Sequence, residues 1–371
     1  MCLNGFPLEF TPHHDAGREW QKITGMTDNG GIFFLLLPSI SVKLDDVMID
    51  KLREKLSGEV LENEPLANHC TFRIGGPARY FFIAKGAEEI VKAVRIARDL
   101  QTPFFIFGGG SNILFSDKGF DGLAVKIASS KYKVVSDGLV EADAGVKLAD
   151  VVAAAAEKGL TGLEWAAGIP GTVGGAVRGN AGAYGKATGE AVESVEALQI
   201  EDLRFKIKNY SQKNCEFGYR DSIFKHNSNI ILKVVLKLQK GAKEKIKTEV
   251  ERIIKERNQK LPLEYPSTGC VLKNVEITDA VLKSFRAHSS EEIPADFIEK
   301  GKIPAAWLVE RCDLKEKKIG GAKISEKHAN FLVNNNKATA SDVVALIGLI
   351  KMKVRDELGV QLQEEIEYVG F

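Results

Sequence analysis

Five consecutive residues, Gly108-Gly109-Gly110-Ser111-Asn112, have the composition of a phosphate-binding loop. They follow a short apolar segment, so their backbone N–H groups can converge on phosphate or pyrophosphate oxygens without side chains in the way. The Ser111 and Asn112 side chains could add hydrogen bonds to the same oxygens. A plain tight turn explains these glycines about equally well, and the third glycine of a Rossmann fingerprint is missing. Alone, the loop is weak evidence for phosphate binding.

A second glycine-rich segment, Gly168–Gly185, strengthens this interpretation. Its many glycines, with Pro170 stiffening the entry, suit a backbone that lies flat against an extended ligand. Two such loops in one unit predict a dinucleotide site. The predicted contacts are Gly108, Gly109, Gly110, Ser111, Asn112, Gly168, Ile169, Pro170, Gly171, Thr172, Gly174, Gly175, Asn180, Gly182 and Ala183.

The elements around the first loop predict an α/β unit. Residues 80–84 and 104–107 are compact apolar strand candidates, and residues 87–100 carry apolar side chains at helical spacing. Two prolines after Lys260 indicate a domain boundary. The other predicted elements are helices 148–158, 242–260, 304–311 and 341–358, and strands 194–200, 230–238 and 362–369.

The composition limits the classes of binding partner and of compartment that are expected for this chain. A net charge of +1 provides no electrostatic attraction to nucleic acid or to anionic membranes. The five cysteines are scattered without a CxxC pair, which argues against a metal site and favours a reducing compartment, the cytoplasm. No apolar run approaches the roughly 20 residues that span a bilayer. A monomer is expected.

The first 47 residues show no sustained periodicity and no signal-peptide pattern. We expect a poorly ordered N-terminal extension over 1–47, with Met48 as a possible alternative start. The remaining chain is then expected to divide into residues 48–129, 130–260 and 261–371.

From His69 to its end the sequence resembles the UDP-N-acetylenolpyruvoylglucosamine reductase (MurB) family, which shares the vanillyl-alcohol-oxidase (PCMH) type of FAD fold. The order and spacing of many modest motifs make this resemblance specific. It departs from the family at Cys270, Val275 and Glu364, where serine, proline and proline are common. The landmarks are His69–Ala78, Gly108–Leu114, Ala167–Gly185, Tyr219–Ser222, Tyr265–Cys270, Lys273-Asn274, Ile319–Phe331 and Leu362–Gly370.

The resemblance implies an α+β fold, in which a two-part FAD-binding domain (48–129 and 130–260) precedes a C-terminal α/β substrate-binding domain (261–371). It also implies an enzyme that holds FAD noncovalently and takes hydride from NADPH. The substrate would be the enolpyruvyl ether of UDP-N-acetylglucosamine, reduced to UDP-N-acetylmuramate. This reaction belongs to peptidoglycan precursor synthesis, and hence to cell-wall biogenesis, cell shape and cell division.

Three residues match the family's catalytic positions. Arg220 would stabilise the negative charge that reaches the substrate carboxylate when hydride arrives. Cys270 would protonate the neighbouring carbon, because a thiol is a stronger intrinsic acid than the usual serine. Glu365 would polarise the developing enolate and would need a raised pKa to carry a proton. Glu364 and Glu367 are expected to face solvent.

The resemblance also predicts residues that bind the substrate or the nucleotide phosphates: Tyr219, Lys260, Lys273, Asn274, Lys327 and His328. His69 matches a site of covalent flavin attachment in related oxidases, but packing or hydrogen bonding is expected here.

Two alternatives remain open at the sequence level. The first is a sugar or alcohol oxidase of the same fold, which would not need Arg220, Cys270 and Glu365. The second is a non-catalytic paralogue that binds FAD or a nucleotide sugar, which loss of a catalytic residue would favour.

Overall fold

The computed structural model describes residues 2–3, 6–7, 9–15, 18–26, 32–38, 40–201 and 204–371. The chain divides into two compact units, Met1–Ser57 and Gly58–Phe371. Parts of the expected 1–47 extension lie outside the described residues, so its disorder stays a prediction; Met48 lies within helix α1. The described elements of the first unit are β1 (Cys2–Leu3), β2 (Phe6–Pro7), β3 (Glu9–Asp15), β4 (Arg18–Met26), β5 (Ile32–Pro38) and α1 (Ile40–Lys55).

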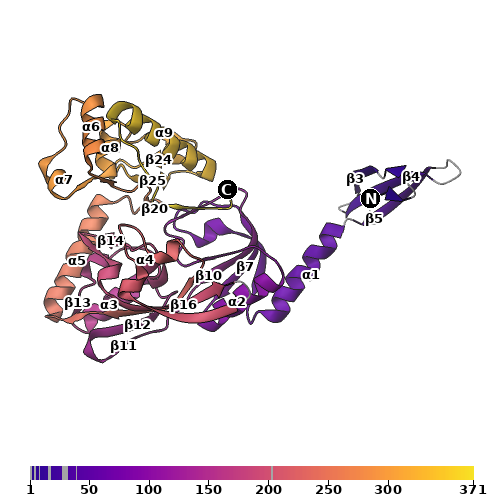
Figure 1. Ribbon diagram of the computed structural model, residues 1–371, viewed down its shortest axis with the longest axis horizontal. Helices are drawn as coiled ribbons and strands as arrows, with labels where there is room; N and C mark the ends of the chain where they lie inside the picture. Colours follow the sequence, from indigo (N-terminus) through magenta and orange to yellow (C-terminus); the bar gives the residue numbers. More distant parts are fainter. Residues whose placement is uncertain are drawn as a thin grey trace. The chain divides into compact units, whose positions relative to one another are not determined.

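The second unit begins with a four-stranded sheet in the order β6-β7-β10-β8. The β7–β10 and β10–β8 pairs are parallel, and α2 (Ala87–Asp99) makes the crossover after β7 (Figure 1). The glycine loop follows β8 directly and is succeeded by the short β9. The bounds are β6 (Val60–Pro65), β7 (Pro77–Ala84), β8 (Phe104–Phe107), β9 (Ile113–Phe115) and β10 (Phe120–Ile127).

A second, antiparallel sheet has the order β11-β12-β18-β16-β17. The helix α5 packs against α3, which also contacts β11 and β12 of this sheet. The short α4 lies within the second glycine-rich segment. The bounds are β11 (Tyr132–Val134), β12 (Leu139–Asp143), α3 (Leu148–Glu157), β13 (Leu160–Thr161), α4 (Val173–Arg178), β14 (Gly182–Ala183), β15 (Lys186–Ala187), β16 (Val192–Glu201), β17 (Arg204–Ser211), β18 (Ile230–Lys237), β19 (Gln239–Lys240) and α5 (Lys243–Lys260).

The C-terminal part combines an antiparallel sheet, β20-β25-β24-β23, with four helices. A capping box at Thr339 starts its longest helix, α9, and Gly359 ends it in the left-handed conformation. The bounds are β20 (Ser267–Cys270), β21 (Val275–Glu276), α6 (Asp279–His288), α7 (Ala295–Glu299), β22 (Lys302–Ile303), α8 (Ala305–Arg311), β23 (Lys318–Ile319), β24 (Ala322–Ile324), β25 (Phe331–Asn334), α9 (Ala340–Leu358) and β26 (Glu367–Val369).

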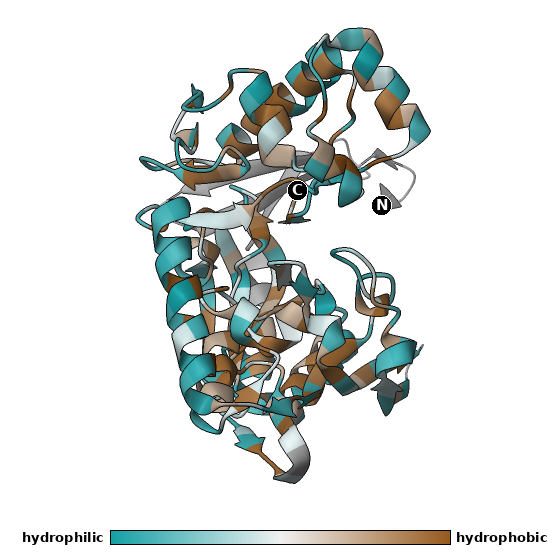
Figure 2. Ribbon diagram, turned by 90° about the vertical axis from the view of Figure 1, so that its left-hand side faces the viewer, coloured by the Kyte–Doolittle hydropathy of each residue, from teal (hydrophilic) through white to brown (hydrophobic). Residues whose placement is uncertain are grey.

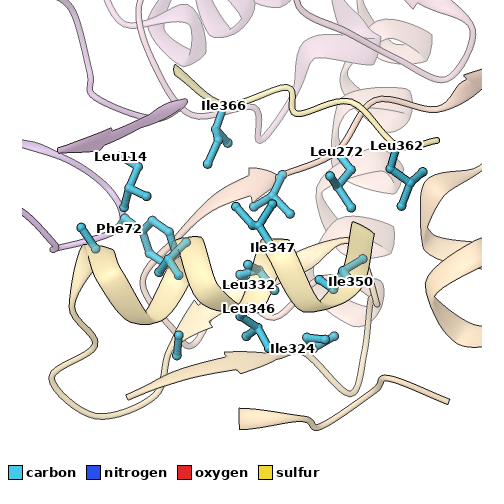
Figure 3. Packing of buried hydrophobic residues seen from close by; sticks show 14 of the residues in the cluster. Phe72, Leu114, Leu272, Ile324, Leu332, Leu346, Ile347, Ile350, Leu362 and Ile366 are labelled. Atoms are coloured by element: carbon cyan, nitrogen blue, oxygen red, sulfur yellow. The ribbon is translucent and has the colours of Figure 1, made fainter. Parts of the chain in front are cut away.

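One hydrophobic cluster joins this C-terminal part to the first sheet. Ile347 of α9 packs in the same core as Phe72 and Leu114, which come from the N-terminal half of the unit (Figure 3). Ile366, beside β26, enters this core as well. Hydrophobic residues concentrate inside the layers, while hydrophilic ones dominate the outer turns of the helices (Figure 2). Burial of apolar surface therefore fixes the two ends of the unit against each other.

The α+β prediction is confirmed, and the predicted helices and strands other than the closing strand are present with ends shifted by up to three residues. The closing strand is shorter than expected, because only Glu367–Val369 forms a ladder, with β9, while Glu364 makes an isolated bridge to Leu272. The domain boundaries at 129/130 and 260/261 stay predictions. Among the described helices, none is both long and apolar enough to cross a bilayer.

A substitution at Asn330 tests the contribution of its hydrogen bonds to the stability of the C-terminal part. This residue is 2 % exposed, and its amide receives a hydrogen bond from the Leu272 N–H (3.0 Å) and donates one to the Leu272 carbonyl (2.8 Å). Asn330→Ala should reduce the free energy of unfolding by about 2–5 kcal/mol, because two buried backbone groups lose their partners. Urea denaturation measures the loss, with the exposed Asn336→Ala as control. Equal urea midpoints for the two variants would contradict this role.

Candidate active site

Both glycine loops line one cavity of about 490 Å³. The loops touch each other, since a Cβ added to Gly109 would lie 2.9 Å from the Cα of Gly171. The Ser111 hydroxyl donates to the Pro170 carbonyl (3.2 Å) and joins the loops a second time. Only glycine permits this approach, so the two loops form a single continuous cradle.

Most of the predicted cradle residues line the cavity, and three do not. Gly174 packs against Ala144, Gly168 lies beside the Arg257 side chain, and buried Asn180 bonds to the backbone of Gly189 and Gly218. These three residues support the loop. The lining members are Gly108, Gly109, Gly110, Ser111, Asn112, Ile169, Pro170, Gly171, Thr172, Gly175, Gly182 and Ala183.

The Asn112 side chain has a protein partner in place of the expected phosphate. The side-chain amide nitrogen donates to the backbone carbonyl of Glu365 (3.0 Å), and the backbone carbonyl of Asn112 accepts from the Glu367 N–H (2.9 Å). Asn112 thus attaches the end of the chain to the first glycine loop. On its other side, the Glu365 N–H donates to Val271 (2.8 Å), one residue after Cys270.

Arg220, Cys270 and Glu365 line this same cavity. The Nε of Arg220 lies 2.9 Å from Oε1 of Glu365, but its N–H is not aimed well enough to count as a hydrogen bond. The contact is therefore an ion pair that leaves a buried donor unsatisfied. The Arg220 backbone is left-handed (φ 56°), which is uncommon for a residue with a long side chain.

The environment changes the acidity of two of these groups. Burial raises the pKa of Glu365, and the nearby positive charges of Arg220 and Lys225 only partly offset this effect. Burial, reinforced by Glu365, raises the pKa of the Cys270 thiol to about 12, although part of the residue's surface remains accessible. At neutral pH the thiol keeps its proton.

Several polar groups in the cavity were not predicted from the sequence, although each stands close to a predicted residue. Arg178 lies inside the second glycine segment, Thr268 two residues before Cys270, and Arg257 about one helical turn before Lys260. Arg257 Nε and Thr268 Oγ1 are buried without hydrogen-bond partners. A bound ligand with acceptor oxygens would satisfy them. The additional lining residues are Arg178, Lys225, Arg257, Thr268 and Glu367.

The expectation that Glu364 and Glu367 face solvent is wrong. Glu367 lines the cavity and forms an ion pair with Arg178. In an extended chain, side chains two residues apart share a face, so Glu367 lies on the same face as Glu365. Glu364 lies on the opposite face, where it pairs with Lys351 (2.8 Å).

The predicted substrate-binding residues separate into two groups. His328 lines the cavity, whereas Tyr219 and Asn274 lie together outside its lining, with the Asn274 N–H donating to the Tyr219 hydroxyl (3.3 Å). Lys260 and Lys327 are surface side chains paired with glutamates, and neither they nor Lys273 line the cavity.

His69 also lies outside the cavity lining. Its ring stacks on Phe81 (4.0 Å between centroids) and hydrogen-bonds to Glu64 (2.8 Å). The structure therefore shows the packing and hydrogen bonding that were expected of this residue.

This arrangement can bind an extended anionic ligand along the glycine cradle and present an acid, a cation and a neutral thiol to a second molecule. Among the described residues, no cluster of three or more His, Cys, Asp or Glu side chains could hold a metal ion.

Comparisons with known proteins agree with this arrangement. Residues 78–202 match the family described as FAD binding domain, and residues 261–369 match the C-terminal domain of UDP-N-acetylenolpyruvoylglucosamine reductase. The chain is 37% identical over 326 residues to the protein of that name from Caldanaerobacter subterraneus subsp. tengcongensis, covering 88% of this chain and 99% of the relative. The protein of the same name from Syntrophomonas wolfei is 35% identical, with 83% and 94% coverage.

A solved structure supports the same grouping. The crystal structure of UDP-N-acetylenolpyruvylglucosamine reductase (MurB) from Thermus caldophilus superposes with a TM-score of 0.64 at 30% identity. The superposition covers 84% of this chain and 98% of that one.

The acidity of Cys270 is directly testable. With a pKa of about 12, its thiolate fraction at pH 8 is about 10⁻⁴, so alkylation by iodoacetamide should be about 1000-fold slower than for an ordinary thiol. The Cys270 peptide is followed by mass spectrometry, and the urea-unfolded protein is the control. The rate should keep rising tenfold per pH unit beyond pH 10. A plateau near pH 9 would contradict the raised pKa.

Proposed function

The chain belongs to the UDP-N-acetylenolpyruvoylglucosamine reductase family, and on that basis we propose that it reduces the enolpyruvyl ether of UDP-N-acetylglucosamine to UDP-N-acetylmuramate with NADPH. It is a flavin-dependent oxidoreductase. One observation carries the proposal: Arg220, Cys270 and Glu365 line the same cavity as both glycine loops.

The residues of the cavity fit FAD. The close approach of Gly109 and Gly171 leaves this point of the cradle free of side chains, which suits a pyrophosphate. Arg257 supplies a cation whose buried Nε has no protein acceptor. When bound, FAD would supply the hydride-transfer chemistry between NADPH and the enolpyruvyl double bond.

The protein's own residues then manage charge and protons. The Arg220 guanidinium is suited to bind the substrate carboxylate and to stabilise the negative charge that develops on it. A protonated Glu365 can share its proton with the same oxygens, and its raised pKa extends the pH range in which it does so. The neutral Cys270 thiol donates the proton from Sγ to the adjacent carbon.

Tyr219, Asn274, Lys260, Lys273, Lys327 and His328 are proposed to hold the nucleotide-sugar or NADPH. Lys260 and Lys327 would have to leave Glu256 and Glu264 to reach a phosphate. Such exposed pairs are weakened by solvent screening, so a phosphate can displace them.

We further propose that the protein acts as a monomer in the cytoplasm, where NADPH and nucleotide sugars are made, without nucleic-acid or membrane partners. Its product would enter peptidoglycan synthesis, and so support cell shape and cell division.

Two half-reactions test the function. The purified protein should be yellow, and NADPH should bleach the flavin anaerobically, because hydride passes to the bound cofactor. Adding the enolpyruvyl substrate should restore the oxidised spectrum, which stopped-flow absorbance follows. Reoxidation by air together with a simple sugar, but not by that substrate, would identify an oxidase. A protein that holds flavin but reacts with neither would be a non-catalytic paralogue.

The role of Cys270 makes a separate prediction. Cys270→Ala should leave reduction by NADPH unchanged but slow reoxidation by the enolpyruvyl substrate by about 10²–10⁴-fold, since the proton donor is lost. Cys270→Ser should retain part of that rate. Cys312→Ala, at a buried cysteine outside the cavity lining, is the matched control and should affect neither half-reaction. Equal loss of both half-reactions in Cys270→Ala would indicate a structural role instead.

A further inference from the structure

Lys225 lines the cavity, and its ammonium group is hydrogen-bonded to Arg220, one of the candidate catalytic residues. It ends a short 3-10 turn (Ile223–Lys225), and its Nζ donates to the backbone carbonyl of Arg220 at 2.9 Å. Lys225 is half-buried, and it lines the cavity together with Glu365 and Glu367. A typical surface lysine keeps its head in water and makes no such contact.

The loop that carries Arg220 depends on such contacts, because its backbone is unfavourable. Arg220 has a positive φ of 56°, between Gly218 and Asp221, which bond to each other through their backbones (3.0 and 3.2 Å). The Asp221 carboxylate is held in turn by His226 (2.8 Å). Lys225 adds a side-chain hydrogen bond to the backbone carbonyl of Arg220 itself.

The same loop is tied to the cofactor cradle. The buried Ser222 hydroxyl donates to the carbonyl of Arg178 (2.7 Å), the last residue of α4. Arg178 pairs with Glu367, so the loop, the cradle and the end of the chain meet at this point.

Lys225 also contributes to the electrostatics of the carboxylates. Burial lowers its own pKa, and Glu367 and Asp221 act against this, whereas Arg178 and Lys273 add to it. At Glu365, the charges that oppose the raised pKa are Arg220, Lys225 and Lys273. Of these, Lys225 is the one that also bonds to the Arg220 backbone.

We propose that Lys225 is a positioning residue: it holds the backbone of Arg220 in its left-handed conformation and supplies a second positive charge that faces Glu365 and Glu367. The inference rests on the proposed function, since it concerns the half-reaction with the enolpyruvyl substrate. Loss of Lys225 would let the Arg220 guanidinium move away from the substrate carboxylate. It would also make Glu365 harder to ionise.

Lys225→Met removes the charge and the donor but keeps the length of the aliphatic chain. We expect reoxidation of the reduced flavin by the enolpyruvyl substrate to slow by about 10–100-fold, the range for a lost hydrogen bond to a charged group. Reduction by NADPH and flavin content should stay as in the unsubstituted protein. Lys225→Arg, which keeps a charged donor, should recover a large part of the rate. Lys237→Met, at an exposed lysine paired with Glu193, is the matched control.

The pH profile distinguishes positioning from mere stabilisation of the fold. The acidic form of Glu365 persists below its raised pKa and is lost as the pH rises through it, so the substrate half-reaction should fall on the alkaline side. Removing the positive charge of Lys225 raises the Glu365 pKa further. The alkaline limb of Lys225→Met should therefore move to higher pH, and that of Lys225→Arg and Lys237→Met should not move.

The outcomes separate the two proposals. If the unsubstituted protein is not reoxidised by the enolpyruvyl substrate, the proposed function fails. If it is reoxidised, but Lys225→Met has an unchanged rate and an unshifted limb, only the role of Lys225 fails. A lower melting temperature with an unshifted limb, or equal slowing of both half-reactions, would also overturn the positioning role. If Lys225→Met does not fold, Lys225→Arg decides. This variant should keep a large part of the rate and an unshifted alkaline limb, and a strongly reduced rate or a shifted limb would contradict the proposal.

Discussion

The attachment of the chain's last segment between two distant parts of the fold determines the geometry of the whole site. Around Glu365, backbone hydrogen bonds run to Val271 on one side, and the Asn112 amide bonds to the Glu365 carbonyl on the other. β26 then pairs in parallel with β9, directly after the first glycine loop. This one short segment is bonded both to the glycine cradle and to the chain next to Cys270. The two parts therefore cannot separate without breaking its hydrogen bonds.

Side chains alternate between two faces along residues 362–367, and the two faces differ in polarity. Leu362 and Ile366 face the core packed around α9 (Figure 3). Glu364, which has the same parity, forms an ion pair with Lys351. Glu365 and Glu367 face the cavity. The apolar residues supply free energy that keeps two carboxylates next to partly buried cations, since burying charges is unfavourable in itself. A slip of one residue would exchange the two faces.

The sequence predicts the elements and the cradle well, because apolar periodicity and glycine spacing are local signals. It predicts the partners of the charged residues poorly. The sequence predicts that Glu367 faces solvent, although it shares the parity of Glu365, and it points to Lys260, whereas Arg257 lines the cavity. Which charge faces inward depends on contacts between segments more than a hundred residues apart, such as that of Arg178 with Glu367, and no local pattern records these contacts.

The same arrangement of charges bears on the proposed role of Cys270 as proton donor at a position where the family commonly has serine. An ordinary thiol, with a pKa near 8.5, would be partly ionised just above neutral pH and could not then donate a proton. Burial is the largest effect that keeps the proton on Sγ; the ionised form of Glu365 disfavours the thiolate further, while Arg220 and Arg257 only partly oppose this. Glu365, which adds to the effect of burial, also lines the cavity that contains the thiol. In the proposed reaction, cysteine can serve as the donor because its surroundings suppress the thiolate; the intrinsic acidity of the thiol alone would not give this result.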